Sequence, residues 1–393
     1  MKRNIIWGSI ISAILLILIT VCYEQTGSIQ PPPKYPAYSE NTYDDKAQRE
    51  ETITLVAAGD CLMHNTQIWS GLQEDGSYDF PTFFADIEYL IKQGDYSSTN
   101  FEAPMAGAAL GYSGYPIFNS PDAAAKAFAD AGFDLIVTAN NHIMDQGFNG
   151  AVRTMQVLHE SGLDTVGTFL SAQDRENYLI KNIRDVNVGY LAYSYSTNGM
   201  PVPAEHSYFF NFLDKEQILA DIKALRPQVD VLVLVLHWGV EYSPEPTDEQ
   251  RDLARQFLTA GADIILGSHP HVIQPMEIVK INDRDKFVIY SMGNFISHQR
   301  GLERNSGIVL KLKLTKDFES GNTVLTEVTY TPTYSHSYQD KGKLCFRVVP
   351  VEKTIQKIKE GEERILTSAE LPDLEAVLLH TKGQLGPMQV LLD

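Results

Sequence analysis

The sequence contains few cysteines. Only Cys22, Cys61 and Cys345 occur among 393 residues. Three widely spaced thiols exclude a framework of several disulfides and the paired spacing of a zinc ribbon, although a single bridge between Cys61 and Cys345 stays open. A chain of this length with a hydrophobic content of 44% can instead bury a sizeable core.

Basic residues are scarce relative to acidic ones. The chain carries 32 Lys and Arg against 50 Asp and Glu, which gives a formal net charge of −18. Binding to nucleic acid or to an anionic membrane surface needs clustered positive charge, and the sequence contains no basic stripe. We therefore expect no nucleic-acid partner.

The one long hydrophobic run lies near the start of the sequence. Lys2 and Arg3 precede an apolar stretch over residues 5–22, which is long enough to cross a bilayer as a helix. Residues 1–23 are therefore predicted to be a membrane anchor or signal, with the positive flank in the cytoplasm and the following residues outside. We expect an uncleaved single-pass anchor in the cell membrane. A lipoprotein signal ending at Cys22 is disfavoured because the preceding valine is larger than the residue such signals prefer.

The residues that follow have the composition of a linker. Residues 24–51 are polar and proline-rich, with three consecutive prolines at 31–33 and no apolar periodicity. This pattern is typical of a semi-extended segment. Such a linker would hold the globular part away from the membrane surface.

Strand and helix patterns alternate over residues 53–295. Residues 231–236, for example, are continuously apolar, as expected of a central strand covered on both faces. Helices are expected at 82–92, 215–225 and 248–260. The alternation predicts an α/β architecture with a largely buried sheet and helices on both sides. Residues 301–393 show alternating strand patterns and then a partly helical tail, and are predicted to complete or flank a main domain at 52–300.

Polar side chains stand where five of the predicted strands end. In open α/β sheets the working residues gather at the carboxyl ends of the strands. Each residue alone has an ordinary explanation, such as a helix cap, an Asx turn or a core histidine, but their coincidence favours one shared site. They are Asp60, His64, Glu102, Asn141, His142, His237, His269 and His271. A Gly- and Tyr-rich loop at 107–115 is of the kind that lines a binding cleft.

This mixture of carboxylates, a carboxamide and imidazoles has a specific chemistry. It suits a pair of divalent metals better than structural zinc, which favours cysteines. Two ions about 3.5–4 Å apart can share a bridging carboxylate and stabilise both the attacking and the leaving oxygen. We predict that Glu102 is the bridge. His142, next to the proposed ligand Asn141, is then free to act as a general acid or to stabilise developing charge.

The motifs around these residues form a joint pattern. They are Gly59-Asp60, Asn100-Phe101-Glu102, Asn140-Asn141-His142 with Asp145 and Gly147, His237-Trp238-Gly239 with Glu241, Gly267-Ser268-His269-Pro270-His271-Val272, and Gly293-Asn294-Phe295. Over about residues 52–300 this pattern resembles the CapA family. These are capsule or poly-γ-glutamate synthesis proteins of the calcineurin-like metallophosphatase superfamily.

The resemblance implies a four-layer α/β/β/α sandwich behind the predicted transmembrane helix, with two divalent ions (Mn, Zn or Fe) at the sheet ends. It assigns Asp60 and His271 to one ion and Asn141, His237 and His269 to the other, with Glu102 between them. His142 matches the catalytic histidine of the superfamily. His64 departs from the pattern, because it lies four residues after Asp60 instead of two. Neighbouring motif residues are expected to contact substrate, namely Asn100, Asp145, Trp238, Glu241 and Asn294.

The resemblance also implies a role at the cell surface. It points to synthesis, export or anchoring of poly-γ-glutamate or a related anionic capsule polymer, with membrane proteins of a capsule synthesis complex as partners. One hypothesis is a metal-dependent hydrolase that acts on a phosphoester or on the amide bonds of the polymer. The alternative is a non-catalytic accessory subunit that binds polymer and partner proteins through a metal-ordered cleft. A site without metal is disfavoured, because crowded buried Asp and Glu side chains would repel one another without a cation.

Overall fold

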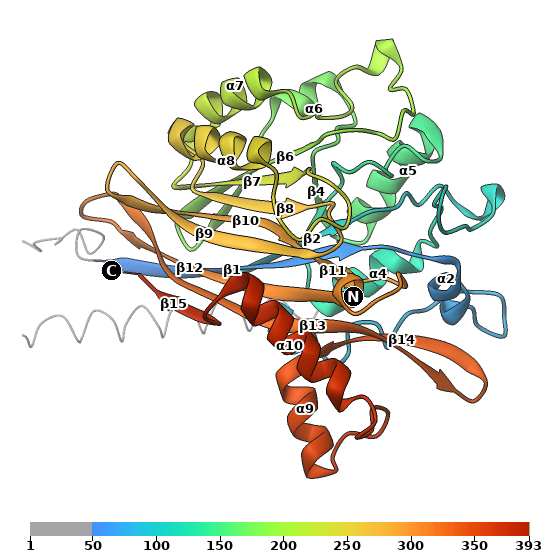
Figure 1. Cartoon of the computed structure of the whole chain (residues 1–393). Coiled ribbons are helices and arrows are strands. Elements are labelled where there is room, and N and C mark those ends of the chain that lie inside the picture. The colour runs from blue at the N-terminus through green and yellow to red at the C-terminus, as the bar shows by residue number, and fades with distance from the viewer. Residues whose placement is uncertain (1–48, 393) are drawn as a thin grey trace, which may run out of the picture. The chain divides into compact units, whose positions relative to one another are not determined.

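Two β-sheets pack face to face and carry helices on their outer faces (Figure 1). The computed structural model describes residues 49–392. The predicted anchor at 1–23 lies outside these residues, as does nearly all of the predicted linker. Within the described part of the chain, no helix has the length and apolar character needed to cross a membrane. The α/β architecture predicted from the sequence patterns and the mixed α/β sandwich implied by the family resemblance are confirmed.

The larger sheet has nine strands. Its order is β14-β13-β12-β1-β2-β3-β4, with β11 paired to β1 and β15 paired to β13. The strands from β1 to β4 run parallel to one another, whereas β12, β13 and β14 are antiparallel. The bounds are β1 (Glu50–Cys61), β2 (Tyr96–Phe101), β3 (Leu135–Val137), β4 (Asp164–Val166), β11 (Asn294–Ile296), β12 (Ser306–Asp317), β13 (Thr323–Asp340), β14 (Lys343–Pro350) and β15 (Gln389–Leu391).

The smaller sheet has six strands in the order β5-β6-β7-β8-β10-β9. The four inner strands are parallel, and β5 and β9 are antiparallel edge strands. The bounds are β5 (Leu179–Ile183), β6 (Val186–Ser194), β7 (Val231–His237), β8 (Ile264–Ser268), β9 (Ile273–Ile281) and β10 (Arg284–Met292). Strand β7 is buried along its whole length, as its continuous apolar sequence requires.

Alternation along the strands assigns side chains to separate cores. In β1, Leu55 and Ala57 face the other sheet, whereas Val56 and Ala58 face the helices outside. Figure 1 shows α7 and α8 side by side over the smaller sheet. The helices are α2 (Asn65–Gly71), α3 (Glu88–Ile91), α4 (Ala123–Ala131), α5 (Gly147–Glu160), α6 (Ala172–Glu176), α7 (Lys215–Leu225), α8 (Asp248–Ala260), α9 (Val351–Glu360) and α10 (Leu371–Leu385).

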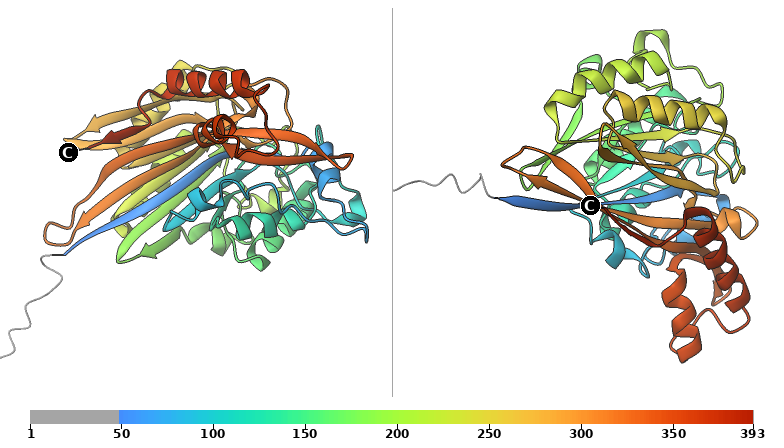
Figure 2. Two further views of the ribbon diagram at one scale, coloured as in Figure 1. Left: turned by 90° about the horizontal axis from the view of Figure 1, so that it is seen from below. Right: turned by 60° about the vertical axis from the view of Figure 1, so that its left-hand side comes forward.

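The C-terminal region joins the same body. Strand β12 lies directly beside β1, so residues 301–393 supply strands to the sheet that carries the first motif. Helices α9 and α10 pack against each other around a small apolar cluster of their own. Figure 2 shows this pair in red at the margin of the sandwich.

The helix expected at 82–92 is much shorter. Only α3, Glu88–Ile91, is helical. The preceding aromatic residues Phe80, Phe83 and Phe84 are buried in the core outside the larger sheet, and they hold the chain in turns. Tertiary packing therefore overrides the local helical pattern here.

The connection between β1 and β11 brings two motifs together. A β-bulge interrupts the register of β1 between Asp60 and Cys61, and places Asp60 opposite Asn294 of β11. A Cβ atom at Gly59 would lie 2.0 Å from the carbonyl oxygen of Gly293, so only glycine allows this close approach. The carboxyl ends of the parallel strands thereby face one region.

Candidate metal centre

Two carboxylates from neighbouring strands form the base of the site. Asp60 lies near the end of β1, Glu102 directly follows β2, and both are fully buried. Asp60 accepts a hydrogen bond from Asn100 Nδ2 at 2.8 Å and another from the backbone N–H of His269 at 3.1 Å. Across residues 49–392, neither carboxylate oxygen of Glu102 has a hydrogen-bond partner. A buried carboxylate without donors is costly unless a cation lies beside it, so Glu102 fits a metal ligand.

The first imidazole comes from the end of β7. His237 is 1% exposed, and its Nδ1 lies 2.9 Å from Oγ of Ser268 at the end of β8. Its Nε2 lies 2.8 Å from Oδ1 of Asn141 and 3.6 Å from Oε1 of Glu102. The contact with Ser268 fixes the ring, so that the other nitrogen points at the carboxylate.

The His-Pro-His turn after β8 supplies two more imidazoles. His269 has φ +96° and His271 has φ +59°, which is unusual for residues with a side chain. Such backbone costs about 1–3 kcal/mol per residue and is often found at functional sites. Nδ1 of His271 lies 3.0 Å from Oδ1 of Asn294, and its Nε2 lies 3.7 Å from Oε1 of Glu102. Nδ1 of His269 is buried and has no hydrogen-bond partner among the described residues.

These side chains form two overlapping groups whose ligand atoms lie within 4.8 Å of one another. One group is Glu102, His269 and His271, and the other is Asp60, Glu102 and His237. Glu102 belongs to both, as a bridging ligand should. The groups do not reproduce the division of ligands between two ions that the family resemblance implies, since His269 falls with His271 and His237 with Asp60. The mixed nitrogen and oxygen donors suit Mn, Zn or Fe.

The electrostatics also favour a bound cation. Burial raises the pKa of Glu102 well above its usual value. Burial would lower the pKa of His271, but Glu102 and Asp60 outweigh it and raise the pKa to about 9. Burial, with neighbouring imidazoles adding to it, lowers the pKa of His269 to about 3 and holds that of His237 well below its usual value. A metal ion would place a positive charge beside these carboxylates and so stabilise their ionised form. It would also be bound by imidazoles in their neutral form.

His142 lies beside this cluster with its own orienting partner. Its Nδ1 is 2.8 Å from Oδ2 of Asp145, and the same oxygen accepts the backbone N–H of Phe118 at 2.8 Å. The Phe118 ring packs edge-on against the imidazole at 4.7 Å, and Nδ2 of Asn198 lies 3.4 Å from Nε2. Asn198 also accepts a hydrogen bond from Asn141. These contacts fix the orientation of the imidazole ring.

Three residues expected to contact substrate hold other site residues instead. Asn100 donates to Asp60, Asp145 pairs with His142, and Asn294 pairs with His271. Their side chains are buried, so they are positioning residues. Asn100 and Asn294 correspond to the partners that orient metal ligands in other sites, whereas Asp145 orients His142, which belongs to neither group of potential ligands.

Trp238 does not join the site, which corrects the expectation of a substrate contact. It follows His237 directly, and side chains alternate between faces along an extended strand. Its ring therefore packs in the core between the smaller sheet and α8, and its indole N–H donates to the carbonyl of Tyr290 at 3.0 Å. Glu241, four residues after His237, is exposed.

His64 is placed differently from the other predicted ligands. It precedes α2, where its ring Nδ1 lies 3.1 Å from Oε1 of Gln67 and accepts the backbone N–H of His298 at 3.2 Å. Burial lowers its pKa to about 4. Within the described chain, it belongs to neither group of potential ligands.

The sequence patterns did not identify three tyrosines as a group around the site. We call Tyr115, Tyr195 and Tyr242 the tyrosine rim; their exposed fractions are 69%, 44% and 40%. The Tyr115 ring lies 6.4 Å from the Phe118 ring, which packs against His142. The Tyr195 ring lies 4.5 Å from the His269 ring, and the Tyr242 ring lies 6.0 Å from the His271 ring. Only the loop at 107–115 carried a sequence signal, because exposed tyrosines in the other loops have no distinctive spacing.

The two cysteines of the described region are free. Cys61 is buried, and its Sγ lies 3.3 Å from Oγ1 of Thr99. Burial raises the pKa of its thiol, so it is inert and structural. The bridge to Cys345 that the sequence left open is not formed.

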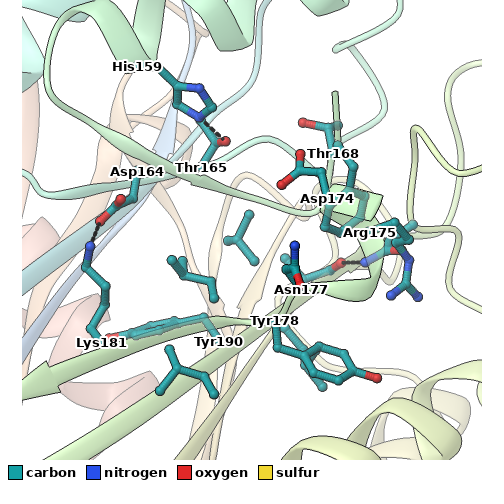
Figure 3. Close-up of a pocket in the computed structure, with 17 residues that line it drawn as sticks. His159, Asp164, Thr165, Thr168, Asp174, Arg175, Asn177, Tyr178, Lys181 and Tyr190 are labelled. Atoms are coloured by element: carbon teal, nitrogen blue, oxygen red, sulfur yellow. Dashed lines mark hydrogen bonds and ion pairs between the residues drawn. The ribbon is translucent and has the colours of Figure 1, made fainter. Parts of the chain in front are cut away.

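A separate cavity of about 280 Å³ lies between β4, α6 and the β5–β6 hairpin (Figure 3). The lysine and the arginine of its wall are each paired with an acid, Lys181 with Asp164 and Arg175 with Asp221. Lys181 forms an ion pair with Asp164 at 2.6 Å, and Nε2 of His159 lies 2.9 Å from Oγ1 of Thr165. None of its lining residues belongs to the candidate metal centre.

A family model described as "Bacterial capsule synthesis protein PGA_cap" matches residues 54–299. The capsule biosynthesis protein CapA of Bacillus anthracis is 28% identical over 82% of this chain and 72% of its own length. The PGA biosynthesis protein CapA of Bacillus subtilis is 29% identical over 75% of this chain and 78% of its own length. A putative 5'-nucleotidase structure from Staphylococcus aureus aligns with a TM-score of 0.47 at 15% identity, over 84% of this chain but only 58% of that one.

Proposed function

The chain belongs to the bacterial capsule synthesis protein family PGA_cap, and from that premise we propose that it is a metal-dependent hydrolase acting on a phosphoester or on the amide bonds of an anionic capsule polymer. The observation that carries the proposal is Glu102, whose two buried oxygens have no donor among residues 49–392 and which is shared by both potential ligand groups. Two divalent ions held there would supply an activated water and stabilise charge on the oxygens that attack and leave.

The protein's own side chains have separate tasks in this proposal. Asp60, Glu102, His237, His269 and His271 would hold the ions. Asn141 would be a further ligand, and its Oδ1 lies 2.8 Å from Nε2 of His237. Asp145 holds Nδ1 of His142, so that Nε2 donates a proton to the leaving group. The assignment of Asp60 and His271 to one ion and of Asn141, His237 and His269 to the other, which the family resemblance implies, is part of the proposal.

The polymer and the location are proposed on separate grounds. The relative from Bacillus subtilis is named for PGA biosynthesis, which supports poly-γ-glutamate or a similar acidic polymer, made together with membrane proteins of a capsule complex. The apolar run at 5–22 supports a single-pass anchor with the sandwich outside the cell membrane.

One observation favours a second candidate, a non-catalytic accessory subunit. The five acidic and imidazole ligands are between 0% and 2% exposed. A metal centre enclosed to this degree can order the surrounding loops for polymer or partner binding without reacting. The two roles differ in their dependence on His142, which neither role needs for metal binding.

The test uses the full chain purified in detergent micelles. Metal content is measured after loading with Mn²⁺ or Zn²⁺, and hydrolysis of a model phosphodiester and of poly-γ-glutamate is then assayed. Absence of metal uptake would end the proposal. Capsule formation by cells that carry His142→Ala separates the two roles, because normal polymer with metal retained indicates the accessory role. Loss of polymer with normal folding and partner binding indicates catalysis.

A further inference from the structure

An arginine from the C-terminal region stands next to the metal centre. Arg304 lies in a single 3-10 turn, Glu303–Asn305, between β11 and β12. Its guanidinium carbon is 3.9 Å from the centre of the Tyr242 ring, and that ring in turn lies 6.0 Å from the ring of His271. One aromatic side chain thus separates the cation from a proposed ligand.

The backbone of this arginine is tied to the same ligand. Its carbonyl oxygen accepts Nδ2 of Asn294 at 2.7 Å, while Oδ1 of Asn294 pairs with His271. The carbonyl also accepts Oγ of Ser297 at 3.2 Å. On the other side, the backbone N–H of Tyr242 donates to the carbonyl of Pro270 at 2.7 Å. Both the arginine and the ring that supports it are therefore fixed to the His-Pro-His turn.

The charge of Arg304 is not neutralised by an acid. Across residues 49–392, no carboxylate forms an ion pair with it, although ion pairs engage several other arginines. Glu241, the exposed neighbour of Tyr242, is the nearest acid along that loop and makes no ion pair with Arg304 in the described chain. In a chain with a net charge of −18, such a cation beside the site selects for anions.

We propose that Arg304 is a specificity-determining residue that binds a carboxylate of the substrate beside the bond held at the metal centre. This inference rests on the proposed function, which brings an acidic polymer to that centre. Stacking covers one face of the guanidinium and leaves its edge free, and that edge matches the two oxygens of a carboxylate. Tyr195 and Tyr242, whose rings lie 4.5 Å and 6.0 Å from those of His269 and His271, stand on the same side as this arginine and would restrict how the polymer lies.

The test measures equilibrium binding of two labelled probes to the full chain in detergent micelles, with and without Mn²⁺. One probe is an octamer of γ-linked glutamate, and the other is the same octamer with its α-carboxylates converted to amides. Arg304→Gln is expected to raise the Kd of the acidic octamer about tenfold and to leave the Kd of the amide within twofold. For Arg304→Lys, the Kd of the acidic octamer should lie between those of the wild type and Arg304→Gln, because lysine keeps the charge but lacks the planar guanidinium.

Arg300→Gln is the matched control. This arginine is exposed on the same segment and has no stacked tyrosine in the described structure, so its removal should change the Kd of the acidic octamer less than twofold. Metal content and melting temperature are measured for every variant. Should Arg304→Gln fail to fold, Tyr242→Leu removes the ring that supports Arg304. This variant should raise the Kd of the acidic octamer several-fold.

Equal effects on both octamers, or no effect on either, would overturn the inference. Displacement of the acidic octamer by inorganic phosphate at lower concentration than by glutarate would overturn the carboxylate assignment. The proposed function fails separately, if metal uptake or turnover is absent. The two failures can be told apart because the Kd values of both octamers are also measured without Mn²⁺. The Arg304 contribution is expected in both conditions.

Discussion

Oδ2 of Asp145 lies 2.8 Å from Nδ1 of His142, three residues earlier in the chain. Both residues belong to the segment between β3 and α5, so the pair is local in sequence. The carboxylate is itself held by the backbone N–H of Phe118. This contact fixes the orientation of the His142 ring.

Asp145→Asn is expected to lower kcat by roughly 10²-fold or more, with little change in KM, because the neutral carboxamide removes the negative charge beside Nδ1 and can present its NH2 group there instead of an oxygen. His142→Ala should lower kcat at least as much. The double variant should be no worse than His142→Ala, because the two residues act as a unit. Steady-state kinetics on a model phosphodiester check this, and additive losses would contradict it. Metal content should match the wild type throughout.

Glu102→Gln is expected to remove at least one of the bound ions, because a neutral carboxamide cannot replace a bridging carboxylate. Elemental analysis of the purified variant measures the loss. In the presence of a chelator, the variant should melt at or above the wild-type temperature, because it no longer buries an unpaired acid. Added metal should raise the melting temperature of the wild type more than that of the variant. Equal metal content in the two proteins would contradict the assignment.

Asp221 provides an acid-dependent contribution to stability away from the site. It accepts hydrogen bonds from Arg175 at 2.6 Å, Tyr178 at 2.9 Å and Tyr193 at 2.6 Å. Burial would raise its pKa, but the hydrogen bonds from Tyr193 and Arg175 outweigh it and hold the pKa below its usual value. Because the folded-state pKa is depressed, this stabilisation is complete above the unfolded pKa of about 3.9 and is lost as the pH falls through the folded value.

Asp221→Asn should therefore lower the free energy of unfolding by roughly 1–3 kcal/mol at neutral pH. The difference between the variant and the wild type should shrink below about pH 4. Denaturant titrations between pH 7 and pH 3 measure it. A difference that stays constant over that range would show that ionisation of Asp221 contributes nothing.

Gly59→Ala is expected to destabilise the sandwich by about 1–3 kcal/mol, because its Cβ would lie 2.0 Å from the carbonyl oxygen of Gly293. The variant should also bind metal more weakly, since the next residue is Asp60. Gly383→Ala is the control. It lies in α10 with no atom within 4 Å of the new Cβ, and should be neutral or stabilise by up to about 1 kcal/mol. Thermal melts and metal titrations of both variants decide the comparison.

Local sequence determined several elements almost to the residue. The helices predicted at 215–225 and 248–260 are α7 and α8. Each begins after a capping residue, Asp214 or Thr247, whose side chain accepts a backbone N–H of the first turn. The strand-end pattern also placed the carboxylates and imidazoles in one region, because parallel strands end at a common edge. These features depend on short-range periodicity and on capping residues, both of which can be recognised in a single sequence.

The tertiary structure decided which polar neighbours reach the metal centre and which only support it. Trp238 adjoins His237 in sequence but faces the core, because side chains alternate along the strand. Asn294 and Arg304 approach His271 through contacts between β11, the loop before β12 and the turn after β8. The order of these segments in the chain does not indicate how close they lie in space. The sequence by itself therefore determined which residue types could bind metal, and only the packing of the two sheets decided their partners.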